Sequence, residues 1–266
     1  MDRNAVLDKY KNEDDRLLVS KLFDRINAVE KQNRVQCTDF LSPVELQVLK
    51  KVLVAVGYKN YVVYGGISNS QRNIIVLFPN KLEDVFKSGK FDFNSICNTI
   101  RISNCSEEME HKRYLGGFIK LGVKREKIGD IIVHENGADV VVLKEITKFL
   151  VSHLKELTRF QNASIEVVDV CDTLEKEQEF EEMKVIVSSL RLDNIVAELA
   201  RTSRSKAAQI LNEERVFVNY ENEGKNTKMV KQGDIITIRG KGKFIIDEIV
   251  GNTKSGRFVL MVKKYV

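Results

Sequence analysis

The sequence predicts an α+β protein, with helices and strands grouped into successive parts of the chain. Its 266 residues are 43 % hydrophobic and 30 % charged, with 15 Gly and 2 Pro, which suits a packed core and excludes collagen-like or wholly disordered chains. Apolar residues recur at helical spacing in some segments and as short β-branched runs in others. These patterns divide the chain into three predicted domains, 1–80, 81–182 and 183–266.

The first domain, 1–80, is predicted to hold two helices and a β-hairpin. Apolar residues recur every three or four positions over 14–31, which predicts an amphipathic helix. The segment 42–45, Ser-Pro-Val-Glu, reads as a capping box with Pro at the first helical position, and Gly57 marks the end of that second helix. The runs YVVYGG and RNIIVLFP flank the Gly/Ser/Asn-rich loop 65–71, so we expect a hairpin there.

The second domain, 81–182, shows a βαββαβ rhythm between residues 93 and 170. This order is typical of a ferredoxin-like, RRM-like fold, in which two helices cover one face of a four-stranded sheet. RNA-recognition motifs stack bases on aromatic residues of a central strand, but the strand ADVVVLKE has none. The acidic run EKEQEFEE, 175–182, favours a boundary at its end.

The third domain, 183–266, begins with two short helices that meet at a basic corner. Leu192, Ile195, Val196 and Leu199 give the first helix one apolar face, and Ser203 is the predicted N-cap of the second. Free backbone N–H groups and the positive end of the helix dipole favour anions at such an N-terminus. The basic side chains around it are Arg191, Arg201, Arg204 and Lys206.

The net charge of +5 is concentrated at this end of the chain. From residue 188 onward there are 15 Lys and Arg against 9 Asp and Glu, whereas 1–187 hold 28 against 29. The third domain is therefore +6 and the remainder −1, which predicts a polyanionic partner for the third domain.

Four spaced motifs in the third domain resemble the RNA-binding domain first described in bacterial ribosomal protein S-four. They are R-L-D, S-R-x-x-A-x-x-L with Ile210 at its last position, V-x-V-N and G-D-x-I-x-V/I, within 188–250. Two positions depart from that pattern, because Glu214 and Tyr220 stand where glycine is usual. The segments TDFLSPVELQVLKKVL, VYGGISNSQRNIIVLFP and LGGFIKLGVKREKIGDIIV extend the similarity to the bacterial YlmH family over nearly the whole chain.

This resemblance implies a non-catalytic factor that binds structured rRNA and tRNA. It also implies action on the large ribosomal subunit, in translation or in quality control of stalled nascent chains, with other rescue factors as further candidate partners. We expect a monomer that needs no cofactor, no metal and no membrane. The expected RNA-contact residues are Arg191, Arg201, Ser203, Arg204, Ser205, Lys206, Asn219, Lys225, Lys228, Lys241 and Lys243. A second candidate patch comprises Lys112, Arg113, Lys120, Lys124, Arg125 and Lys127.

Two other classes of function compete with this hypothesis. One is an RNA-modifying enzyme, of the pseudouridine synthase or rRNA methyltransferase type, that uses the third domain as an RNA anchor. The sequence lacks a Gly-rich cofactor loop after a strand, and Asp193 is better interpreted as a partner for Arg191 than as a catalyst. The other is a protein–protein adaptor that uses the first two domains.

Cysteine spacing and hydropathy predict a cytoplasmic protein with reduced thiols. Its four scattered Cys show neither disulfide nor zinc-ligand spacing, so we expect free, buried thiols. No apolar stretch approaches the length of about 20 residues that spans a bilayer, and the N-terminus lacks the apolar core of a signal peptide.

Overall fold

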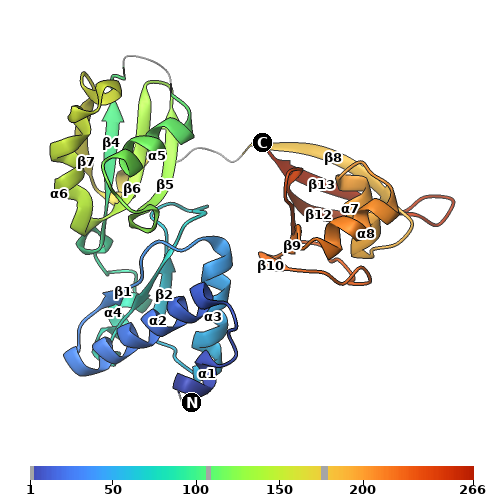
Figure 1. Cartoon of the computed structure of the whole chain (residues 1–266), viewed down its shortest axis with the longest axis horizontal. Coiled ribbons are helices and arrows are strands. Elements are labelled where there is room, and N and C mark those ends of the chain that lie inside the picture. Colours follow the sequence, from blue (N-terminus) through green and yellow to red (C-terminus); the bar gives the residue numbers. More distant parts are fainter. Residues whose placement is uncertain (1–2, 106–108, 175–178) are drawn as a thin grey trace. The chain divides into compact units, whose positions relative to one another are not determined.

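The computed structural model describes residues 3–105, 109–174 and 179–266, and the chain forms two compact units, Met1–Lys176 and Glu177–Val266 (Figure 1). Helices and strands are both abundant, so the predicted α+β class is confirmed. The described residues form three sheets, two in the first unit and one in the second. None of the described helices combines the length and apolar character needed to cross a membrane.

The N-terminal part of the first unit places helices against a small antiparallel sheet. The helices are α1 (Arg3–Leu7), α2 (Glu13–Gln32) and α3 (Pro43–Val56), and the strand order is β1 (Gln36–Cys37), β3 (Ile74–Leu77), β2 (Tyr61–Tyr64). The predicted capping box starts α3: the Ser42 hydroxyl accepts from the N–H of Glu45, and the Glu45 carboxylate accepts from the N–H of Ser42. Gly57 ends that helix with φ 70°.

The remainder of the first unit, after the short helix α4 (Glu83–Lys87), is a four-stranded antiparallel sheet with two helices. Its elements are β4 (Cys97–Ser103), α5 (His111–Lys120), β5 (Ile128–His134), β6 (Gly137–Leu143), α6 (Lys144–His153) and β7 (Ser164–Val168). The strand order β5-β6-β4-β7 is that of a split βαβ fold. Tyr114 and Phe118 of α5 and Leu150 of α6 share a core with Ile100 and Val140, so both helices cover one face of the sheet.

The second unit packs two helices on one six-stranded sheet. Its elements are β8 (Phe180–Val187), α7 (Leu192–Leu199), α8 (Arg204–Asn212), β9 (Val216–Val218), β10 (Glu221–Asn222), β11 (Ile235–Ile238), β12 (Gly242–Asn252) and β13 (Phe258–Tyr265), and the strand order is β10-β9-β11-β12-β13-β8. Ile195 and Leu211 of the helices meet Val218, Ile236 and Val262 of the sheet in one core.

The segment 177–187, most of which is strand β8, reduces the charge excess of this unit. The predicted boundary between residues 182 and 183 falls inside β8, which pairs with β13 from Phe180 opposite Tyr265 onward. Counted from residue 177, the second unit has 16 Lys and Arg against 13 Asp and Glu, a net charge of +3. The acidic run therefore belongs partly to the basic unit, although 175–178 lie outside the described residues.

The two positions where glycine is usual keep a glycine-like backbone. Glu214, after the end of α8, has φ 54°. Asn219 and Tyr220 have φ 52° and 67° and form the two-residue turn between β9 and β10, since Val218 pairs with Glu221. A left-handed conformation costs a non-glycine residue about 1–2 kcal/mol. The backbone is therefore left-handed at both positions, although neither residue is glycine.

The four cysteines are free, but the prediction that all are buried is wrong. Cys97 is fully buried in β4, Cys37 and Cys105 are partly exposed, and Cys171 is exposed. Cys171 lies in a short 3-10 turn after β7, where its neighbour Val170, not the thiol, points into the core.

Candidate nucleic-acid interface

A buried carboxylate organises the basic corner of the second unit. Asp193, in the first turn of α7, is only 4 % exposed. Arg191 donates two hydrogen bonds to its carboxylate, Nε to Oδ1 at 3.1 Å and Nη2 to Oδ2 at 3.0 Å. Arg204, at the start of α8, also bonds Oδ2, through Nε at 3.0 Å and Nη2 at 2.9 Å. One carboxylate therefore holds two guanidinium groups, and the cluster keeps a net positive charge.

The titration of Asp193 reflects these contacts. Burial alone would raise the pKa of its carboxyl, but hydrogen bonds from Arg191 and Arg204 outweigh burial and lower that pKa below its ordinary value. The side chains of Arg191 and Arg204 remain 36 % and 55 % exposed. The corner thus presents two positioned guanidinium groups to solvent, a geometry suited to phosphate.

The first turn of α8 is basic, although the helix dipole disfavours cations there. Ser203 is the N-cap, as predicted, and its hydroxyl accepts from the N–H of Lys206 at 3.3 Å. Arg204 and Lys206 lie in that first turn, which contains no acidic residue, and Ser205 is exposed between them. A helix that begins with cations loses about 0.3–1 kcal/mol relative to one that begins with carboxylates. An anion at this end would remove that penalty.

Two further predicted residues meet at a hollow of about 390 Å³ beside this corner. Arg201, in the turn between α7 and α8, and Lys241, in the β11–β12 turn, both line it. Lys264 of β13 lines it too, and the Lys264 ammonium pairs with Glu181 at 2.9 Å. Phe244 supplies an apolar wall. The sequence motifs did not predict Lys264 as a contact residue, because they end before β13.

The loop between β10 and β11 packs on the N-terminus of α7. The backbone carbonyls of Asn226 and Lys228 accept from the N–H groups of Asp193 and Leu192, at 3.2 and 2.8 Å. That helix end is therefore closed to an external anion. The Lys228 ammonium pairs with Glu223 at 3.0 Å, while Lys225 is exposed.

Two of the predicted contact residues are engaged inside the fold. The Asn219 side chain donates to Asp234 and accepts from the N–H of Ile235, which stabilises its turn. The Lys243 ammonium lies 4.9 Å from the ring centroid of Tyr220 and 4.2 Å from that of Tyr265. Burial lowers the pKa of Lys243.

In the first unit, the sheet face opposite α5 and α6 is covered. Val141 of β6 points to that face, is fully buried, and belongs to a core with Phe40, Ile74 and Val170. Gly66 of the β2–β3 loop lies so close that a Cβ there would stand 3.0 Å from the Val141 side chain. RNA-recognition motifs stack bases on the corresponding face. Here the N-terminal hairpin, with Phe40 and Val170, occupies it.

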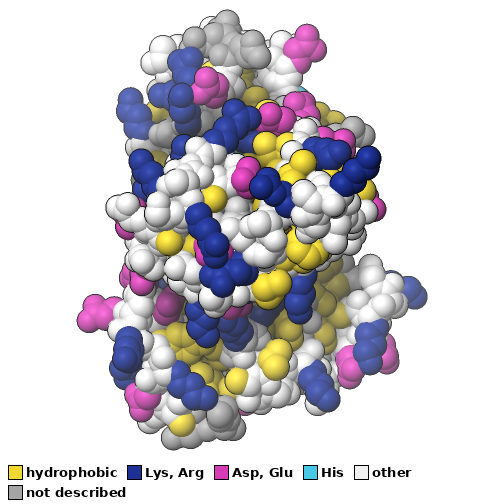
Figure 2. Space-filling model, turned by 90° about the vertical axis from the view of Figure 1, so that its right-hand side faces the viewer, with side chains coloured by type: hydrophobic (Ala, Val, Ile, Leu, Met, Phe, Trp, Pro, Cys, Tyr) yellow, Lys and Arg dark blue, Asp and Glu magenta, His cyan; other side chains and the backbone are white. Residues whose placement is uncertain are grey.

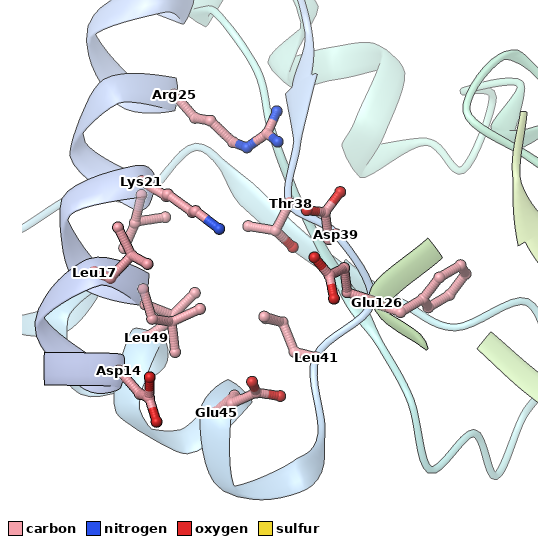
Figure 3. Close-up of a pocket in the computed structure, with 13 residues that line it drawn as sticks. Asp14, Leu17, Lys21, Arg25, Thr38, Asp39, Leu41, Glu45, Leu49 and Glu126 are labelled. Carbon is pink, nitrogen blue, oxygen red and sulfur yellow. The ribbon is translucent and has the colours of Figure 1, made fainter. Parts of the chain in front are cut away.

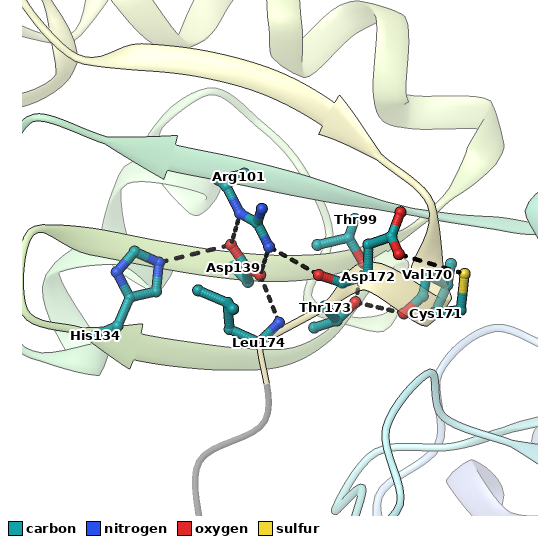
Figure 4. Close-up of polar contacts among 9 residues, drawn as sticks. All are labelled: Thr99, Arg101, His134, Asp139, Val170, Cys171, Asp172, Thr173 and Leu174. Carbon is teal, nitrogen blue, oxygen red and sulfur yellow. Dashed lines mark hydrogen bonds and ion pairs between the residues drawn. The ribbon is translucent and has the colours of Figure 1, made fainter.

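An ion pair fastens the segment after β7 onto the same face (Figure 4). Arg101 of β4 binds Asp139 of β6 with two hydrogen bonds of 2.9 and 2.8 Å and also donates to the carbonyl of Asp172. Asp139, fully buried, accepts in addition from the N–H of Leu174. Burial would raise the pKa of Asp139, but these hydrogen bonds lower it. His134 lies 3.6 Å from the same carboxylate.

The second predicted patch separates into two groups. Arg125 donates to the carbonyls of Ile128 and Gly129, and burial lowers its pKa to about 10. Lys127 pairs with Asp39 and Glu145 at 2.7 and 2.6 Å. Both side chains thus hold the fold together. The others, Lys112, Arg113, Lys120 and Lys124, lie on α5 or directly after it.

Comparison with known proteins agrees with the resemblance to the YlmH family noted in the sequence. Residues 89–171 match the family described as "Putative RNA-binding domain in YlmH". The chain is 27 % identical to "Ribosome-associated protein quality control protein P2" of Bacillus subtilis over 245 residues, 92 % of this chain and 93 % of the relative. The chain is YlmH-like.

A solved structure is also similar to this YlmH-like chain. It is "Cell division protein ylmH from Streptococcus pneumoniae", with 20 % identity and a TM-score of 0.49. The similarity covers 62 % of this chain and 98 % of that one.

A hollow in the N-terminal part of the first unit is a poor match for a polyanion (Figure 3). It has a volume of about 270 Å³ and lies between α2, α3 and the segment 38–41. Lys21 and Arg25 project into it from α2, but the acidic residues that line it outnumber these two cations. The acidic lining residues are Asp14, Asp39, Glu45 and Glu126.

One group of potential metal ligands occurs among the described residues of the YlmH-like chain. Side-chain atoms of Asp169, Cys171 and Asp172 lie within 4.8 Å of one another, and all three residues are exposed. Such exposed acidic groups are common without an ion. The expectation that the chain needs no metal stays a prediction.

Proposed function

We propose that the chain is a non-catalytic RNA-binding factor that binds structured rRNA and tRNA on the large ribosomal subunit. It would act in translation or in quality control of stalled nascent chains, as a cytoplasmic monomer without a cofactor. The observation that carries this proposal is the corner at α7 and α8. There a buried carboxylate positions two exposed guanidinium groups beside a helix N-terminus that already carries Lys206.

The similarities support the class of partner. The matched family is described as RNA-binding, and the relative in Bacillus subtilis is named for ribosome-associated quality control. Charge alone would not locate the site, because Figure 2 shows Lys and Arg side chains on every part of the face drawn, with Asp and Glu among them. Positioned guanidinium groups with exposed donors are the more specific signal.

The geometry gives less support to an RNA-modifying enzyme. Both oxygens of Asp193 accept hydrogen bonds from arginines, and its carboxyl is almost completely buried. A nucleophile or base needs a lone pair that reaches the substrate. Asp193 instead acts as the holder of Arg191 and Arg204.

The test reverses charge at the corner while it leaves the Asp193 cluster intact. Arg201→Glu with Lys206→Glu changes two exposed side chains, whereas Arg204→Glu would place a new carboxylate against Asp193. The double variant should lower affinity for purified large ribosomal subunits at least about tenfold and reduce the salt dependence, since each phosphate contact contributes about 0.7–0.9 to the log–log slope.

The matched control is Lys254→Glu with Arg257→Glu in the β12–β13 turn, which has the same charge change in the same unit. Its affinity should stay close to that of the wild type. Equal losses in the two double variants would mean that net charge, not the corner, determines binding. Unchanged binding by the corner variant would refute the proposal.

A further inference from the structure

Helix α5 contains a glycine for which the fold gives no reason. Gly116 lies in the middle of the ten-residue helix, is exposed, and has no atom within 4 Å of where a Cβ would be. Its neighbour Gly117 is different, because a Cβ there would stand 2.7 Å from the Phe160 ring. Glycine inside a helix costs about 0.8–1.0 kcal/mol relative to alanine. Packing explains that cost at Gly117 but not at Gly116.

Lysines flank Gly116 on the same side of the helix. Lys112 and Lys120 lie four residues before and after it, so the three positions form one row about 12 Å long. Lys112 is 80 % exposed, and its pair with the equally open Glu110 is a weak surface contact. Lys120 is exposed as well. The row therefore places two solvent-facing ammonium groups on either side of a bare stretch of helix backbone.

The surroundings of this row are basic. The sequence from residue 111 to 124 contains Lys112, Arg113, Lys120 and Lys124 and no Asp or Glu. Arg159, from the turn before β7, adds a cation, because its Nη1 donates to the backbone carbonyl of Arg113 at 2.7 Å. A surface of this charge is complementary to a polyanion.

The opposite face of the domain is not available for the same purpose. The N-terminal hairpin and the segment after β7 cover the sheet at Val141 and Asp139, both fully buried. A ligand of this domain therefore meets its helical side or its edges. The basic row on α5 is on the helical side (Figure 1).

We propose that the sugar–phosphate backbone of an RNA lies across α5 at Gly116, between the ammonium groups of Lys112 and Lys120. Glycine permits close approach of the RNA to the helix backbone, and the lysines neutralise the flanking phosphates. This inference rests on the proposed function for its class of ligand. It adds a second RNA-binding surface, in a different domain from the α7–α8 corner.

The decisive experiment measures folding and binding of the full chain in parallel. Gly116→Ala should raise the midpoint of thermal unfolding by about 2–4 °C, because alanine favours the helix. Gly116→Gln, with a longer uncharged side chain, should bind purified large ribosomal subunits about tenfold more weakly while the protein stays folded. Ser152→Gln, at an exposed position of α6, is the matched control and should bind normally.

A second pair of variants tests the charges. Lys112→Ala with Lys120→Ala should reduce the log–log salt slope by about 1.4–1.8, the contribution of two phosphates. Lys31→Ala with Lys148→Ala, exposed lysines of α2 and α6, should leave the slope unchanged.

The outcomes separate this inference from the proposed function. Normal binding by the Gly116→Gln and Lys112→Ala/Lys120→Ala variants, with loss in Arg201→Glu/Lys206→Glu, would overturn the inference alone. Retained binding in all of them would overturn both. A loss toward intact subunits but not toward protein-free rRNA from the same subunits would identify a protein as the occupant of α5 and overturn the RNA assignment.

Discussion

Two buried aspartates in this chain each accept two hydrogen bonds from one arginine, and Asp193 also binds a second, yet they produce opposite surfaces. At the central sheet, Asp139 has one guanidinium partner, and Arg101 turns inward to hold the carbonyl of Asp172. At the corner of the second unit, Asp193 has two guanidinium partners, and both remain partly exposed. The first pair is neutral and closes a surface, while the second is positive and open.

The difference shows that an arginine–carboxylate pair is not in itself a sign of a binding site. What distinguishes the two is the number of cations per carboxylate and the direction of the unused donors. Spare guanidinium donors at Asp139 meet the protein's own backbone, whereas Arg204 at Asp193 is 55 % exposed. Perturbing each aspartate should therefore affect different properties of the chain.

The largest expected effect is on folding of the first unit. Asp139→Ala leaves Arg101 without its buried partner and the N–H of Leu174 without its acceptor. Loss of one member of a buried pair costs about 3 kcal/mol or more. Guanidinium chloride unfolding should show this loss, and Arg101→Leu with Asp139→Val should recover most of it. If Asp139→Ala were as stable as the wild type, the Arg101–Asp139 ion pair would have no structural role.

The second largest expected effect is on the second unit: the ionised Asp193 carboxylate should contribute about 2 kcal/mol to the free energy of unfolding, and this contribution should depend on pH. The pKa of Asp193 is lowered from the ordinary 3.8 in the folded chain. The stabilisation is therefore complete at pH values above 3.8 and is lost as the pH falls through the lower, folded-state value.

Asp193→Asn should accordingly be less stable than the wild type at neutral pH, with the difference shrinking under acid conditions. Urea unfolding as a function of pH measures this. A difference that is constant from pH 7 to pH 2 would contradict a role for the ionised carboxylate. The same variant should bind large subunits more weakly, because Arg191 and Arg204 lose their positions.

The smallest expected effect on stability comes from Lys206→Glu, which should change stability and RNA affinity in opposite directions. A glutamate at this third position of α8 could reach back to the N–H of Ser203 and complete a capping box, which favours the helix by about 0.5 kcal/mol. The same substitution removes a cation from the corner, so RNA affinity should fall as stability rises. Thermal unfolding and subunit binding are measured on one preparation; parallel changes of the two would mean that Lys206 acts only through the fold.

Local sequence patterns predicted much of the fold. The capping box at Ser42, the apolar spacing in α7 and the N-cap at Ser203 are all interactions within a few residues, and each is present in the structure. The left-handed backbone at Glu214 and Tyr220 also agrees with a pattern in which glycine is usual.

Local sequence patterns did not predict contacts between residues that are far apart in the sequence. Arg204 reaches Asp193 only because α7 and α8 meet at a particular angle, and no spacing rule connects them. Coverage of the central sheet depends on Phe40 and Gly66 packing on Val141, a contact between parts predicted as separate domains. The engagement of Lys127 with Asp39 arises from the same packing. The charge run alone could not separate such structural cations from exposed ones.

Strand β8 has a consequence for synthesis of the chain. Among the described residues β8 pairs with β13 alone, and Phe180 leaves the ribosome 85 residues before its partner Tyr265. A strand that waits unpaired is a template for aggregation, and charged residues oppose this. Glu181 and Glu182, which dilute the basic charge of the folded unit, lie on that strand. They are suited to keep the nascent segment soluble until its partner arrives.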